Sequence, residues 1–64
     1  MKNGDKVLIK SDVALVGGMK GVISDVIVEG EFTSYVVTLT ETRGIWQDGD
    51  EVTLDAYEVE ESLQ

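Results

Sequence analysis

Apolar and polar residues alternate in several short stretches of the chain, as they do in strands with one buried face. Residues 5–10 place Val7 and Ile9 on one side. The segment 20–29 is rich in valine and isoleucine, which favour strands. Apolar and polar side chains alternate most regularly in residues 34–42. These three segments are therefore predicted to be strands.

The next part of the chain predicts a hairpin. Residues 45–47 and 51–54 both carry apolar side chains, and they flank the dipeptide Asp48-Gly49. This dipeptide is typical of two-residue turns between antiparallel strands. We therefore expect two short strands joined at this point.

The C-terminal region predicts one helical turn and a last strand. Asp55 can cap a single turn over residues 55–57, because aspartate is a preferred residue at helix N-termini. Residues 58–60 are then expected to close the sheet through Tyr57 and Val59. No stretch of the chain has the 3.6-residue period of a long helix.

The number and length of these elements indicate the fold class. A small, strongly bent barrel is the simplest way for five short strands to avoid exposed edges. The chain has 64 residues, enough for one domain. We predict that residues 1–64 form a single all-β domain, a five-stranded SH3-like barrel with at most one short helical turn near the C-terminus.

Three segments carry a resemblance to a known family. Residues 4–9 read Gly-Asp-Lys-Val-Leu-Ile, residues 18–23 read Gly-Met-Lys-Gly-Val-Ile, and residues 57–60 read Tyr-Glu-Val-Glu. In this order they resemble the small SH3-like barrels of the KOW type, whose members include nucleic-acid-binding ribosomal proteins and elongation factors and small subunits of redox complexes. The residues that carry the resemblance are those that the barrel needs for its own geometry; Gly18 and Gly21, for example, permit a tight bend or a positive φ angle. The resemblance therefore implies a fold rather than a function.

The charge is large and unevenly distributed. The chain has 13 acidic and 5 basic residues and a formal charge of −8. Residues 1–24 carry four lysines and two aspartates, a net +2, whereas residues 25–64 carry eleven acidic residues and Arg43, a net −10. Because binding to phosphates requires a surface rich in lysine and arginine, direct nucleic-acid binding is not expected.

The composition also excludes most catalytic chemistry. The chain has no cysteine and no histidine, so it lacks a thiol nucleophile, an imidazole base and the usual zinc ligands. The sequence Asp48-Gly49-Asp50-Glu51 lacks the spacing of a calcium-binding loop. We expect that the protein is not an enzyme and has no catalytic residue, no cofactor and no metal site.

The chain has no long apolar segment and no signal-peptide pattern. We therefore expect a cytoplasmic protein with no membrane partner.

Two groups of apolar residues are candidates for contacts with a partner. The loop after the first strand can expose an apolar patch for a partner or for self-association, or it can cover the open end of the barrel. Its apolar residues are Val13, Leu15, Val16 and Met19. Trp46 adjoins Ile45, and only one of the two can face inward. If Ile45 is buried, Trp46 is a candidate interface anchor.

The acidic residues are a third candidate. They form either a surface for a basic partner or a solvated face that keeps the protein soluble. The residues of this candidate acidic face are Glu29, Glu31, Asp48, Asp50, Glu51, Asp55 and Glu58.

Three functions are compatible with these features. The first is a non-enzymatic protein-interaction module, or small accessory subunit, that docks on a larger protein or complex. The second is an acidic inhibitor or nucleic-acid mimic of the kind that phages and mobile elements encode, which binds a basic, nucleic-acid-handling protein. The third is a structural protein that forms a homo-oligomer.

Overall fold

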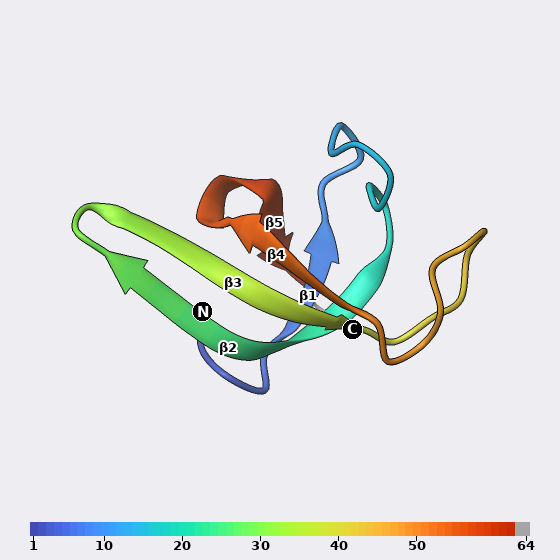
Figure 1. Cartoon of the computed structure of the whole chain (residues 1–64), viewed down its shortest axis with the longest axis horizontal. Coiled ribbons are helices and arrows are strands. Elements are labelled where there is room, and N and C mark those ends of the chain that lie inside the picture. Colours follow the sequence, from blue (N-terminus) through green and yellow to red (C-terminus); the bar gives the residue numbers. More distant parts are fainter. Residues whose placement is uncertain (63–64) are drawn as a thin grey trace.

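The computed structural model describes residues 1–62, which form one antiparallel sheet of five strands (Figure 1). The strands are β1 (Lys6–Ile9), β2 (Lys20–Glu29), β3 (Phe32–Leu39), β4 (Glu51–Asp55) and β5 (Val59–Glu61), and the single 3-10 turn η1 (Ala56–Glu58) connects the last two. The prediction of an all-β chain with one short helical turn near the C-terminus is confirmed.

The sheet is strongly curled. Its strand order is β4-β3-β2-β1-β5, so β4 and β5 are the outermost strands. In a flat sheet they would lie about 19 Å apart, because neighbouring strands are spaced by about 4.8 Å. The three residues of η1 nevertheless link them, and a 3-10 helix rises only about 2 Å per residue. The two edges therefore approach each other at η1, but β4 and β5 do not pair and the sheet is not closed.

Strand β2 bends at a bulge and belongs to two parts of the sheet. Its first residues pair with both β1 and β3, and the residues after the register shift between Ile23 and Asp25 pair with β3 only. Ser24 lies at this shift, and its Oγ donates a hydrogen bond of 3.1 Å to the carbonyl of Val36. Bulges bend a strand and increase its twist. The far part of the β2–β3 hairpin therefore projects from the rest of the molecule, at the left of Figure 1.

Every strand contributes to one hydrophobic core. Val7 and Ile9 are fully buried, as the alternation in residues 5–10 predicts. The remaining buried residues are Val16, Met19, Ile23, Tyr35, Val37, Leu39, Leu54 and Val59. Within residues 1–62 no buried side-chain nitrogen or oxygen lacks a hydrogen-bond partner. Two of the ten core residues, Val16 and Met19, come from the loop between β1 and β2.

Two strand predictions need correction. The predicted strand over residues 34–42 begins at Phe32 and ends at Leu39. It begins earlier because Gly30 and Glu31 alone form the turn, with Glu29 paired to Phe32 and with φ of +59° at Gly30. A glycine at the first position of a two-residue loop suits the twist of a hairpin. The predicted strand over residues 45–47 is absent.

The region between β3 and β4 is a long loop rather than a hairpin turn. Asp48 and Gly49 do form a turn, because the Asp50 N–H donates to the Gln47 carbonyl over 2.9 Å. Arg43 and Trp46 form a second turn through a pair of backbone hydrogen bonds. Because the two turns occupy residues 43–46 and 47–50, no residues remain for a strand before β4.

The C-terminal prediction is confirmed in part. The helical turn follows Asp55, whose N–H donates to Glu58 Oε1 over 2.9 Å. Val59 is buried as expected. Tyr57 is 73% exposed and does not close the sheet, because η1 directs it to solvent instead of continuing the alternation of a strand.

Candidate interaction surface

The loop between β1 and β2 divides its apolar residues between the core and the surface. Val16 and Met19 are buried, and Val13 packs partly against the same cluster. Leu15 is 77% exposed. The two buried residues are thus part of the core and not of an exposed patch. Of the four candidate residues in this loop, Leu15 presents its side chain to solvent.

The backbone of Leu15 has an unfavourable conformation. Its φ is +72°, and it is the single non-glycine residue with positive φ among residues 1–62. The left-handed region costs an ordinary L-residue about 1–2 kcal/mol, because Cβ approaches the carbonyl oxygen. Glycine or asparagine adopts this conformation more readily. Leu15 therefore weakens the fold at this position and buries little surface in return.

Arg43 connects this loop to the loop between β3 and β4. Its Nη2 donates to the carbonyl of Gly17 over 2.7 Å and to that of Leu15 over 3.3 Å. In the sequence, Arg43 is 26 residues from Gly17 and 28 residues from Leu15. Figure 1 shows both loops at the end of the molecule opposite the turn of the β2–β3 hairpin. Hydrogen bonds from a charged donor are stronger than neutral ones, so Arg43 fixes the position of the backbone beside Leu15.

The orientation of Ile45 and Trp46 is settled by their burial. Trp46 is partly buried and packs against the core, whereas Ile45 is 85% exposed. Trp46 was a candidate interface anchor if Ile45 was buried, and Ile45 is the more exposed of the two. Ile45 lies at the tip of the turn between Arg43 and Trp46. We define the loop-end surface as Leu15, Arg43 and Ile45; Trp46, at the end of the same turn as Ile45, packs against the core.

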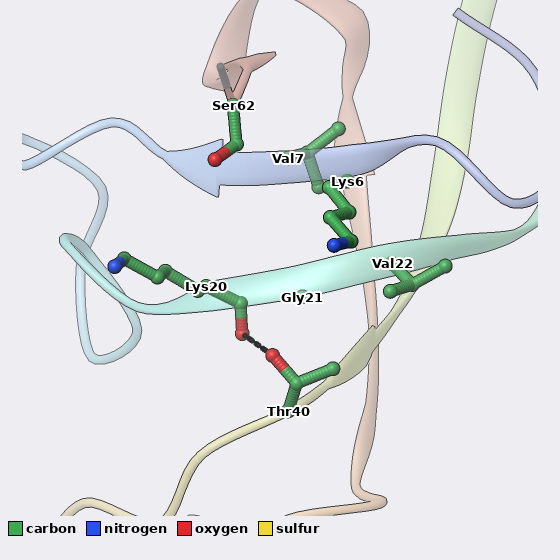
Figure 2. Close-up of a pocket in the computed structure, with 7 residues that line it drawn as sticks. All are labelled: Lys6, Val7, Lys20, Gly21, Val22, Thr40 and Ser62. Atoms are coloured by element: carbon green, nitrogen blue, oxygen red, sulfur yellow. Dashed lines mark hydrogen bonds between the residues drawn. The ribbon is translucent and has the colours of Figure 1, made fainter. Parts of the chain in front are cut away.

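A shallow groove lies on the sheet between β1 and β2. Its volume is about 320 Å³, and its lining residues are Lys6, Val7, Lys20, Gly21, Val22, Thr40 and Ser62 (Figure 2). The Lys6 side chain extends from β1 toward β2, whereas that of Lys20 extends along β2 away from it. The Thr40 Oγ1 donates to the Lys20 carbonyl over 3.3 Å. The two lysine side chains of this groove therefore extend in different directions.

A second hollow separates the β1–β2 loop from η1. It has a volume of about 250 Å³ and is lined by Asp12, Val13, Ala14, Tyr57 and Glu58. A hydrogen bond with Asp55, followed by the negative charges of Asp55 and Glu58, raises the pKa of Tyr57 above its ordinary value of 10.0. The phenol is therefore neutral at physiological pH, and the carboxylates around it give this hollow a negative field.

The residues of the candidate acidic face are distributed over the whole length of the molecule. Glu29 adjoins the turn of the β2–β3 hairpin and Glu31 lies in it. Asp48 and Asp50 lie in the loop at the opposite end, where Asp50 Oδ2 accepts the Gln47 N–H over 2.8 Å. Glu51 and Asp55 are the ends of β4, and Glu58 ends η1. The structure thus spreads these seven residues along the molecule, from the turn of the β2–β3 hairpin to the loop between β3 and β4.

The structure also defines what the described part of the chain does not contain. Among residues 1–62 no three carboxylates lie close enough together to hold a metal ion. No helix in this part of the chain has the length and apolar composition needed to cross a membrane.

Sequence reasoning missed the contact of Arg43 with the β1–β2 loop and the exposure of Tyr57. One feature of the sequence pointed to the contact of Arg43, which is the single basic residue among residues 25–64.

No family model, curated protein or solved structure matches the chain.

Proposed function

We propose that the protein is a non-enzymatic protein-interaction module with an SH3-like barrel architecture, which docks on a larger protein through the loop-end surface. The strand order, the bent β2 shared by two parts of the sheet, and the 3-10 turn between the last two strands support this architecture. The KOW-type resemblance of residues 4–9 and 18–23 is consistent with it.

The observation that carries the proposal is the state of Leu15. A leucine that is 77% exposed at φ of +72° contributes little burial and adds backbone strain. Strained residues are found most often at binding and switch sites. An apolar side chain in such a position is best explained by contact with another molecule.

The neighbouring residues fit the same role. Arg43 bonds to the Leu15 carbonyl and restrains the loop, so less conformational entropy is lost when Leu15 is buried by a partner. Ile45 adds a second exposed apolar side chain on the adjoining loop. Trp46 holds that loop against the core.

The test compares substitutions of two side chains with nearly equal exposure, Leu15 and Phe32. Leu15→Asn replaces the apolar side chain with one that tolerates positive φ, so the fold should keep its stability. Phe32→Asn changes a side chain that is 78% exposed at the opposite end of the molecule. Partner proteins would be captured from a lysate with the wild-type protein and both variants. Loss of an interface anchor costs about 2 kcal/mol or more, so the Leu15 variant should bind the captured partner at least about thirtyfold more weakly.

The same capture at low and high salt separates this proposal from the acidic alternative. Contacts of apolar residues are retained at high salt, whereas binding through many carboxylates weakens steeply as salt screens the charges. A partner recovered at low salt only, and equally by wild type and Leu15→Asn, would contradict docking by the loop-end surface. Such a partner would favour the inhibitor or nucleic-acid mimic.

A further inference from the structure

One edge of the β2–β3 hairpin is unpaired. Strand β1 pairs with residues 20–22 of β2, and the N-terminal segment extends this pairing through hydrogen bonds of Gly4 and Asp5 with Ile23. Beyond the bulge, residues 25–29 have strand partners in β3 alone. Within residues 1–62, no backbone hydrogen bond joins residues 25–29 to a neighbour on their other side.

The backbone groups that point outward on this edge belong to Val26 and Val28. In a two-residue hairpin the pair beside the turn, here Glu29 and Phe32, exchanges both backbone hydrogen bonds. Alternate residues therefore direct their N–H and C=O groups away from β3, which identifies Val28 and Val26. The N–H of Val26 confirms this direction, because it donates to Asp25 Oδ1 over 2.9 Å.

The two faces beside this edge differ in chemistry. Val26 pairs with the buried Tyr35, so Val26 and Val28 share the face of the core. Asp25, Ile27 and Glu29 alternate with them and lie on the opposite face. An added strand would thus have valines beside it on one face and two carboxylates flanking an isoleucine on the other.

These surroundings discriminate between two occupants. A second copy that paired antiparallel through its own β2 edge, centred on Ile27, would place Asp25 opposite Glu29 of that copy. Like charges directly opposite each other destabilise a strand pair, and each copy carries a formal charge of −8. A strand with basic residues at those two positions would form favourable pairs instead.

We infer that the edge of β2 at residues 25–29 binds an extended protein segment that has apolar residues opposite Val26 and Val28 and basic residues opposite Asp25 and Glu29. Main-chain hydrogen bonds to Val26 and Val28 hold the segment, as in other cases of strand addition. Its basic side chains lie opposite Glu29 and Asp25. A carbonyl of the segment replaces Asp25 Oδ1 as acceptor for the Val26 N–H, which frees this carboxylate for the basic residue. This inference does not depend on the role proposed for Leu15.

The direct test uses two labelled synthetic peptides, Lys-Val-Thr-Val-Lys with blocked ends and its counterpart Glu-Val-Thr-Val-Glu. We expect the lysine peptide to bind the full chain and the glutamate peptide to bind at least about tenfold more weakly. Amide hydrogen exchange gives a specific signature, because the exposed Val28 N–H should become protected in the complex. Binding of both peptides with equal affinity, or protection elsewhere than residues 25–29, would overturn the inference.

Val28→Pro blocks the edge and leaves the β2–β3 pairing intact. Proline removes an N–H that points away from β3, so no hydrogen bond of the hairpin is lost. We expect this variant to lose binding of the lysine peptide, and the matched control Val28→Thr to keep it. Unchanged binding by a folded Val28→Pro would overturn the inference.

A charge exchange tests the partner's chemistry without proline. In the double variant Asp25→Lys with Glu29→Lys, the preference should reverse in favour of the glutamate peptide. An unchanged preference for the lysine peptide would overturn the inference. A wild-type dimer that Val28→Pro dissociates would do so as well, since it would show that a second copy occupies the edge.

Discussion

The substitution Gly21→Ala tests how closely the curled sheet is packed. A Cβ built at Gly21 would lie 2.5 Å from Val37 Cγ1 and 2.7 Å from the Thr38 carbonyl oxygen. Both contacts are shorter than van der Waals distances allow, and the second involves backbone that cannot rotate away. Val37 is fully buried, so its side chain has no free space to enter.

The expected cost follows from these contacts. Overpacking a well-packed core costs about 1–3 kcal/mol, and two short contacts place Gly21→Ala at the upper end. Alanine recovers about 0.5–1 kcal/mol because it has less freedom than glycine in the unfolded chain. The net loss is about 2 kcal/mol. For a domain of this size the melting temperature should fall by about 8–16 °C, since each kcal/mol shifts it by about 4–8 °C.

Thermal unfolding followed by circular dichroism measures this shift, with Gly44→Ala as control. At Gly44 φ is +60° and nothing lies within 4 Å of a built Cβ, so that variant tests backbone strain without a steric clash. Its net cost should be about 1 kcal/mol or less. Val37→Ala should also cost less in the Gly21→Ala background than in wild type, because it removes one of the two contacts. A Gly21→Ala protein as stable as Gly44→Ala would refute the packing argument.

Two further predictions concern the loop end and η1. Arg43→Met removes the hydrogen bonds to Leu15 and Gly17, so amide exchange in the β1–β2 loop should accelerate while the melting temperature changes little; an unchanged exchange rate would show that Arg43 does not restrain the loop. An absorbance titration should give Tyr57 a pKa above 10.0 that Asp55→Asn lowers, and no change would contradict the effect of Asp55 on this phenol. Because the folded state holds this proton more tightly than the unfolded chain, its contribution to stability is complete below pH 10.0 and is lost as pH rises through the folded pKa.

The sequence predicted those features that depend on local alternation. Strand β2 has the predicted bounds, since its valines and isoleucines lie between a glycine-rich loop and a glycine turn. The buried positions Val7 and Ile9 follow directly from a period of two. Gly18 and Gly21 were recognised as special positions, but for different reasons. Gly18 has φ of +86°, whereas Gly21 is required by the close approach of Val37 and Thr38.

Features that depend on distant contacts could not be predicted in this way. The division of the β1–β2 loop between buried Val16 and exposed Leu15 follows from how the loop folds over the core, and four apolar residues alone do not specify it. The bond from Arg43 to Gly17 joins residues 26 positions apart. The choice between Ile45 and Trp46 was open because a turn, rather than a strand, determines which side chain faces inward.

The proposed strand addition at the β2 edge would give two of the carboxylates, Asp25 and Glu29, a physical role. A free strand edge beside exposed Val28 and Phe32 is a common cause of association between identical chains. In the antiparallel register centred on Ile27, Asp25 and Glu29 oppose such pairing, because two copies would bring these carboxylates together without a counter-charge. The same two carboxylates favour a strand with basic residues. If a basic segment binds this edge as proposed, the same two carboxylates disfavour one partner and favour another, and specificity of this kind requires both.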